Sequence, residues 1–211
     1  MLIGVVDLGI NNLTSIQKSF SEKLETADEL VVIDSDFDIR KPDLVILPGL
    51  GKFSAGMNAL RERNLIVKIK GWKNDGSKVV GICLGMQLLG TTSEESKGIE
   101  GLDLIPGIVE RLPANQGERV PHTGWAETIT AIDDQPFSAI SAPGDFYFVH
   151  SYHFIPENKD TVLTRTQFGA SSFVSSVLSK DILGFQFHPE KSGNKGKQLV
   201  TEIISWARNE S

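Results

Sequence analysis

The chain has 211 residues, of which 40% are hydrophobic and 23% charged, and its formal net charge at pH 7 is −6. This composition is ordinary for a globular protein, and the negative charge gives no general attraction to nucleic acid or to an anionic membrane. One cysteine excludes a disulfide within the chain, and no apolar stretch approaches the ~18 residues of a membrane span, so we expect a cytoplasmic protein.

The first half of the chain alternates short apolar runs with segments of helical periodicity. The runs expected to be strands are residues 2–6, 31–33, 44–47 and 79–82. The segments expected to be helical are residues 14–24 and 55–72, together with a helix that opens at 85–89. This alternation predicts a parallel sheet with helices on both faces. Because residues 2–6 follow no basic leader, we expect a strand there and not a signal peptide.

The second half of the chain is richer in strands. We expect them at residues 108–112, 146–149, 162–166, 172–178 and 183–187, with a closing amphipathic helix at 195–206. The prediction is therefore an α/β fold whose mostly parallel central sheet is extended by antiparallel strands. Since no repeat, low-complexity tract or linker interrupts the pattern, residues 1–211 are assigned to one domain.

The only cysteine, Cys83, follows an apolar run and precedes a helical pattern. Gly81 and Gly85 flank it at two residues on either side, a spacing that suits a sharp strand-to-helix turn. A cysteine at such a turn lies near a helix N-terminus, which favours the nucleophilic thiolate, and the backbone N–H of Leu84 could face a developing oxyanion. The alternative interpretation is that Cys83 is a small core residue.

A cysteine nucleophile needs a base and a group that orients the base. Of the four histidines, only His188 has a carboxylate at a useful local spacing, in the segment His188-Pro189-Glu190. Pro189 favours an extended conformation at His188, and in extended chain residues i and i+2 project to the same side. Glu190 is therefore expected to orient the His188 ring, although a purely structural turn would have the same sequence.

Two further segments resemble known binding motifs. The segment Pro48–Phe53 is rich in glycine but fails as a phosphate-binding loop, because Phe53 stands where Ser or Thr is needed. Its backbone N–H groups could still meet an anion or oxyanion. His150 and His153 would face opposite sides of a strand and have no evident third ligand, so we expect no metal site.

The chain resembles the class I (triad-type) glutamine amidotransferases, and most closely the branch formed by glutaminase subunits of imidazole glycerol phosphate synthase. Seven segments in order carry the resemblance: residues 7–13, 47–51, 81–87, 100–102, 120–125, 148–152 and 187–190. It implies a flavodoxin-like fold and a glutaminase that needs no cofactor. It also implies a heterodimer with a (β/α)₈ barrel cyclase, which receives the ammonia for histidine biosynthesis.

The resemblance also implies roles for individual residues. Cys83 would form a thioester with glutamine, while His188 would act as the acid and base and Glu190 would orient it. The backbones of Leu84, Leu50 and Gly51 are candidates for the oxyanion site. The residues expected to bind glutamine are Gly51, Gln87, Glu95, His150, Ser151 and Tyr152, and those expected on the docking face are Asn12, Lys52, His122 and Trp125.

The sequence differs from the family pattern at Asn11, Thr14, Thr123 and Ala126, which all lie in segments expected to face the partner. These departures keep open a paralogue that supplies ammonia to a sugar-amidating system in surface-polysaccharide synthesis. A catalytically silent scaffold of the same fold is a third hypothesis. The intact Cys83, His188 and Glu190 argue against it.

Overall fold

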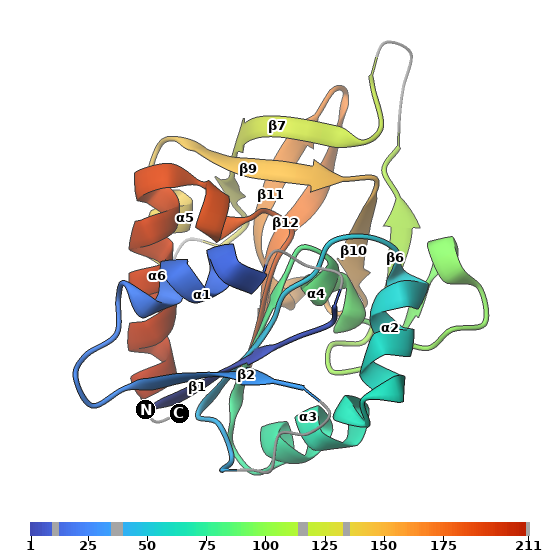
Figure 1. The fold of residues 1–211 in the computed structure, drawn as a ribbon. Helices are drawn as coiled ribbons and strands as arrows, with labels where there is room; N and C mark the ends of the chain where they lie inside the picture. Colours follow the sequence, from blue (N-terminus) through green and yellow to red (C-terminus); the bar gives the residue numbers. More distant parts are fainter. Residues whose placement is uncertain (10–12, 35–39, 114–117, 133–135, 210–211) are drawn as a thin grey trace.

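A mixed central sheet forms the middle of the computed structural model (Figure 1), which describes residues 1–9, 13–34, 40–113, 118–132 and 136–209. Within these ranges the sheet has eight strands in the order β2-β1-β3-β4-β13-β12-β11-β8. Their bounds are β1 (Leu2–Val6), β2 (Glu29–Ile33), β3 (Leu44–Leu47), β4 (Lys78–Ile82), β8 (Ile129–Thr130), β11 (Val162–Phe168), β12 (Ser171–Ser179) and β13 (Ile182–Phe185). Neighbouring strands from β2 to β13 are parallel and those from β13 to β8 are antiparallel, which confirms the predicted sheet.

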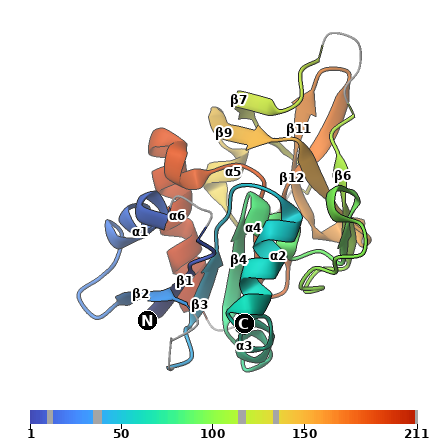
Figure 2. The same ribbon diagram turned by 45° about the vertical axis from the view of Figure 1, so that its right-hand side comes forward.

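Helices cover both faces of the parallel part (Figures 1 and 2). One face carries α1 (Leu13–Ser21), α5 (Ser138–Ser141) and α6 (Gly193–Arg208), and the other carries α2 (Phe53–Glu62), α3 (Leu65–Asn74) and α4 (Leu84–Leu88). Strand β3 shows why: Leu44 and Ile46 belong to the cluster under α1 and α6, whereas Val45 and Leu47 belong to the cluster under α2 and α3. Successive residues of a strand point to opposite faces, so a continuous apolar run is buried on both.

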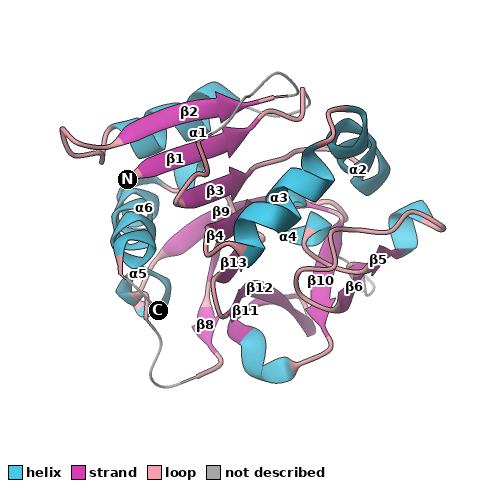
Figure 3. Ribbon diagram, turned by 90° about the horizontal axis from the view of Figure 1, so that it is seen from below, coloured by secondary structure: helices cyan, strands magenta, loops and turns pink. Residues whose placement is uncertain are grey.

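Two smaller sheets stand beside the antiparallel part. One joins β5 (Thr92–Ser93), β6 (Gly107–Arg111) and β10 (Tyr152–Pro156), at the right of Figure 3, and the other pairs β7 (His122–Glu127) with β9 (Asp145–His150). Short 3-10 helices occur at η1 (Glu94–Ser96), η2 (Lys159–Thr161) and η3 (Pro189–Lys191). Only Ser151 separates β9 from β10, so the chain passes from one small sheet to the other at that residue.

The prediction of one continuous helix over residues 55–72 is wrong, because the structure divides this segment into α2 and α3. The break lies at Asn64, whose backbone is left-handed (φ 56°, ψ 27°). Asparagine adopts this conformation more readily than most residues, because its side chain can hydrogen-bond locally. The apolar periodicity continues across the break, which is why it predicted one helix.

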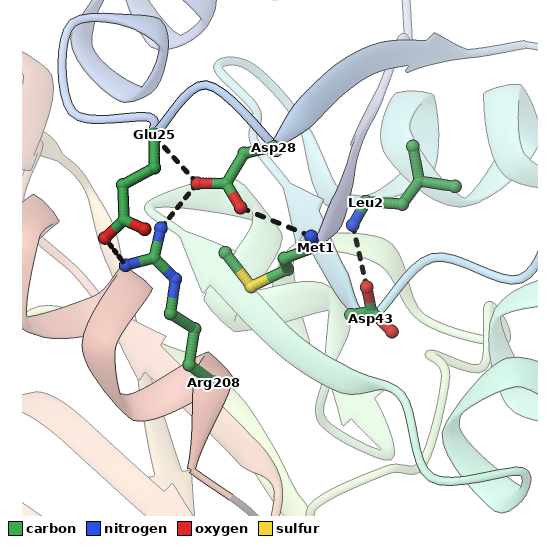
Figure 4. A network of polar contacts seen from close by, with 6 residues as sticks. All are labelled: Met1, Leu2, Glu25, Asp28, Asp43 and Arg208. Carbon is green, nitrogen blue, oxygen red and sulfur yellow. Dashed lines mark hydrogen bonds and ion pairs between the residues drawn. The ribbon is translucent and has the colours of Figure 1, made fainter.

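Polar contacts tie the last turn of α6 to the amino end of the parallel strands (Figure 4). Arg208 forms ion pairs with Glu25 and Asp28 in the turn before β2. Asp28 also accepts a hydrogen bond from the amine of Met1 at 3.2 Å. The catalytic candidates lie at the other end of these strands. Across the described ranges, no helix has the length and apolar character needed to cross a membrane.

Candidate active site

The three predicted catalytic residues and the glycine-rich loop follow neighbouring parallel strands. The loop at residues 48–51 follows β3, Cys83 follows β4, and His188 lies three residues after β13. Because β3, β4 and β13 are adjacent and parallel, their carboxyl ends meet at one edge of the sheet. Ligands of open α/β sheets bind at such an edge.

Cys83 has a backbone conformation that non-glycine residues rarely adopt, with φ 55° and ψ −109°. The glycines around it permit the turn: a Cβ on Gly85 would lie 1.6 Å from the carbonyl oxygen of Leu47, and one on Gly81 would lie 2.7 Å from the backbone of Gly85. The predicted strand-to-helix turn is thus present. Since α4 spans only five residues, its dipole can give the sulfur little help.

His188 and Glu190 meet as the sequence predicts, but by a different backbone route. The Nδ1 atom of His188 lies 2.8 Å from Oε1 of Glu190, and both side chains are 3% exposed. His188 itself is extended, whereas Pro189 begins the 3-10 helix η3, so the contact forms across a turn and not along a strand. Proline suits the first position of such a helix, because the missing N–H would have no partner there.

The surroundings of His188 hold a positive charge on its ring. Burial alone would lower its pKa, but the charge of Cys83, the hydrogen bond to Glu190 and the charge of Glu190 together raise this pKa to about 10. The Nε2 atom is buried and makes no well-aligned hydrogen bond to any described residue, so its contact with Cys83 is chiefly electrostatic. Nδ1 faces the carboxylate, so Nε2 is the nitrogen that can exchange a proton with a reacting group.

A cavity of about 290 Å³ opens beside Cys83. All six residues expected to bind glutamine line it: Gly51, Gln87, Glu95, His150, Ser151 and Tyr152. The other residues of its wall are Leu50, Cys83, Leu84, Pro121 and Val149. Its wall therefore comes from the loop after β3, from α4, from η1 and from the junction of β9 and β10. Pro121 and Val149 were not predicted as parts of this wall, although both lie in motifs that carry the family resemblance.

Hydrogen bonds hold two of the cavity residues in place. Glu95 accepts the N–H of Phe53 at 2.7 Å, which attaches η1 to the first turn of α2. The Nδ1 atom of His150 lies 2.9 Å from the carbonyl oxygen of Tyr152, so this nitrogen must carry the hydrogen, and the opposite Nε2 lies 3.3 Å from Nδ1 of His122. Burial lowers the pKa of His150 to about 3, and the ring is neutral at pH 7.

The backbone N–H of Leu84, a candidate oxyanion donor, is already engaged. It donates to the carbonyl oxygen of Gly49 at 3.4 Å, which is long for a hydrogen bond. Leu50 and Gly51 follow directly and border the cavity, and Gly51 has a φ of 108° that favours glycine. For Leu84 to face a substrate oxygen, the carbonyl of Gly49 must first turn away.

Of the residues expected on the docking face, the structure describes Lys52, His122 and Trp125. Lys52 is exposed at the N-terminus of α2, and His122 and Trp125 lie on β7, where the Trp125 side chain is 54% exposed. Asn12 lies outside the described residues, as does Asn11. In the part of the chain that is described, no group of three or more histidine, cysteine or acidic residues is placed to hold a metal ion.

Gln186 is a buried polar residue beside Cys83 that was not predicted from the sequence. It is fully buried, and its Nε2 atom lies 3.7 Å from the sulfur of Cys83. It stands in the segment that leads into His188, between two buried phenylalanines. A glutamine in such an apolar run was the available signal, because buried polar side chains need hydrogen-bond partners.

Known proteins resemble this chain over nearly its whole length. The family model described as "Glutamine amidotransferase class-I" matches residues 5–205. Among the relatives is "Imidazole glycerol phosphate synthase subunit HisH" of Prochlorococcus marinus (strain MIT 9211), 42% identical over 97% of this chain and 94% of the relative. Proteins of the same name from Moorella thermoacetica and Pyrococcus furiosus are 40% and 41% identical, over 98% and 94% of this chain and 97% and 95% of theirs.

Solved structures share the fold at lower identity. A chain of PurLQS from Thermotoga maritima has a TM-score of 0.70 at 20% identity, with 98% of this chain and 99% of that chain covered. The glutaminase domain of Trypanosoma brucei CTPS has a TM-score of 0.63 at 16% identity, with 98% and 92% covered. These structures bear on the fold alone.

Proposed function

This chain belongs to the class-I glutamine amidotransferase family, and on that premise we propose that it is the glutaminase subunit of an imidazole glycerol phosphate synthase. The observation that carries the chemistry is the pairing of His188 with Glu190 at 2.8 Å beside the sulfur of Cys83. The histidine-pathway assignment, and not the sugar-amidating alternative, is supported by relatives that are 40–42% identical over nearly the whole chain. Residues 1–211 would then form one glutaminase domain.

In the proposed reaction, the thiolate of Cys83 attacks the side-chain amide carbon of glutamine bound in the cavity. The carbon–nitrogen bond breaks as Nε2 of His188 gives its proton to the departing nitrogen, which leaves ammonia and a thioester. Nε2 then takes a proton from water, which attacks the thioester and releases glutamate and the thiolate. Glu190 stabilises the charged imidazolium, which is present before the first proton transfer and forms again in the second.

The hydrogen bond between Leu84 and Gly49 supports a low rate in the isolated chain. An oxyanion donor is worth about 10²–10³ in turnover when it is aimed at the reacting oxygen. Since the Leu84 N–H is engaged at 3.4 Å by Gly49, we propose that docking of a (β/α)₈ barrel partner on the face of Lys52, His122 and Trp125 turns the Gly49–Gly51 loop. Ammonia would then pass to that partner.

The test is glutamate release with and without the cognate barrel subunit and its ligand, for the wild type and for Cys83→Ala. We expect turnover that the partner accelerates in the wild type and none above background in the variant. A buried hydroxyl elsewhere provides the control: Thr164→Val, on β11, is expected to keep its turnover. Equal turnover in Cys83→Ala and the wild type would overturn the proposal.

A further inference from the structure

The pairing of two central strands places Gln186 beside the sulfur of Cys83. In β4 and β13, Gly81 is opposite Gly184 and Ile82 is opposite Phe185. The N–H of Cys83 continues this pairing by donating to the carbonyl oxygen of Phe185 at 2.7 Å. The next residue, Gln186, is therefore level with the turn that carries the sulfur, and its own N–H is fixed by the carbonyl oxygen of Ser175 at 2.9 Å.

The orientation of the Gln186 amide follows from a chain of hydrogen bonds that begins at a main-chain carbonyl. The carbonyl oxygen of Tyr152 can only accept, so the nitrogen of the Gln87 amide must face it, at 2.8 Å. The same nitrogen lies 3.1 Å from Oε1 of Gln186 and supplies its second hydrogen there. Gln186 must therefore turn its nitrogen toward the sulfur of Cys83, 3.7 Å away.

The sulfur consequently faces a donor and an acceptor that favour different protonation states. The carbonyl oxygen of Val149, 3.8 Å away, can accept only from the protonated thiol. The amide of Gln186 donates, and a donor stabilises the thiolate more than the thiol. Both act in a buried environment, where such contacts are stronger than in water.

We propose that Gln186 is a positioning residue that favours the thiolate of Cys83, with Gln87 and the Tyr152 carbonyl fixing the direction of its amide. This rests on the proposed function for its purpose, because the thiolate is the attacking species there. The same contacts restrict Gln87 in the cavity. Both of its amide hydrogens are used, so only its Oε1 can contact a substrate, as an acceptor.

The experiment measures how fast iodoacetamide alkylates the chain as a function of pH, by mass spectrometry. Cys83 is the only cysteine, so the adduct is unambiguous. The wild type is compared with Gln186→Met, which keeps the length of the side chain but loses the donor, and with Gln186→Glu, which keeps the acceptor toward Gln87 and replaces the donor by oxygen. Thr164→Val is the matched control, since its hydroxyl is buried and contacts Ser175 and Ser176 but not the sulfur.

We expect the midpoint of the pH profile to rise by about one unit in Gln186→Met, which is about tenfold slower alkylation at neutral pH, and to rise further in Gln186→Glu. The profile of Thr164→Val should match that of the wild type. An unchanged midpoint in folded Gln186→Met would overturn the proposal. The readout needs no glutamine, so a chain without glutaminase activity would still test it.

A measurement on the wild type covers the case in which both variants fail to fold. The side-chain amide nitrogen of Gln186 should change its NMR chemical shift with the same pH midpoint as the alkylation. A signal that stays constant while Cys83 titrates would equally overturn the proposal.

Discussion

His188 is buried, and burial by itself disfavours a charged ring. Its pKa is nevertheless raised to about 10, since Cys83 and Glu190 both favour the charged form. In Glu190→Gln the negative charge is lost while the size is kept, so we expect this pKa to fall and partner-stimulated turnover to fall by about 10²-fold or more. The pKa is measured from the ring ¹⁵N shifts of His188, and turnover from glutamate release.

The control for this substitution is Glu202→Gln on α6. Glu202 accepts hydrogen bonds from Ser138 and the N–H of Ala139, away from the imidazole. Its loss should leave the pKa of His188 where it is. A His188 ring that titrates identically in Glu190→Gln and the wild type would show that the carboxylate does not control it.

The lowered pKa of His150 predicts that the stability of the chain depends on pH. Its pKa is about 3 in the folded chain, because burial disfavours the charged ring, against 6.5 when unfolded. Between these values the unfolded chain binds a proton that the folded chain does not, so stability falls as the pH falls through this window. From pH 7.5 to 5 the loss from this residue is about 2 kcal/mol.

His150→Gln removes that titration and should flatten the pH dependence of unfolding by this amount, measured in urea at both pH values. His153, whose pKa is also lowered, to about 4, remains in both chains and cancels in the comparison. An equally steep loss of stability in the variant would contradict the assignment of the effect to His150.

At the level of elements, the turn between β4 and α4 depends on the absence of a side chain at Gly85. A Cβ there would lie 1.6 Å from the carbonyl oxygen of Leu47, and neither backbone can move without separating β3 from β4. We expect Gly85→Ala to lower the free energy of unfolding by about 3 kcal/mol or more. Gly71, inside α3, has no atom within 4 Å of the same position.

Gly71→Ala is therefore the matched substitution, and it should stabilise the chain by about 0.5–1 kcal/mol, because alanine loses less backbone entropy in a helix. Urea unfolding measures both values. The account of the turn fails if the two substitutions have effects of the same sign and size.

The central strands were predictable because their signals are local. The runs at residues 2–6, 44–47 and 79–82 are short, apolar and bounded by turn residues, and each became a strand within one residue of the prediction. β7 and β10 were not predicted. β7 alternates half-buried and exposed residues around a glycine, a pattern too weak to detect, and β10 follows β9 with only Ser151 between them.

The candidate site was predictable in part for the same reason. The glycine spacing around Cys83 and the short His188–Glu190 interval can be recognised in the sequence without knowledge of the fold. The position of Gln186 cannot, because it depends on the register between β4 and β13, which are about a hundred residues apart. The engagement of Leu84 by Gly49 likewise depends on two loops that meet only in space.

On the scale of the whole molecule, the two ends of the parallel strands have different chemistry. At the amino end, Arg208 forms ion pairs with Glu25 and Asp28. The carboxyl end carries the cavity, and β7 lies beyond it, at the top of Figure 1, with α3 at the bottom. We therefore expect a partner that receives ammonia to dock at the β7 end, on the side where the cavity beside Cys83 lies.

Trp125 and Val67 test that orientation. Trp125, on β7, is 54% exposed and contacts Tyr147 edge-to-face, whereas Val67, on α3, is 79% exposed at the opposite end. Both are exposed apolar side chains, so neither substitution by alanine should change the stability of the free chain much.

Buried at an interface, a tryptophan contributes about 2 kcal/mol or more, so Trp125→Ala should weaken binding of the barrel subunit about 30-fold. Calorimetric titration measures the dissociation constant, and Val67→Ala should stay within about twofold of the wild type. The reverse pattern would place the partner on α3 and rule out transfer of ammonia through the β7 face.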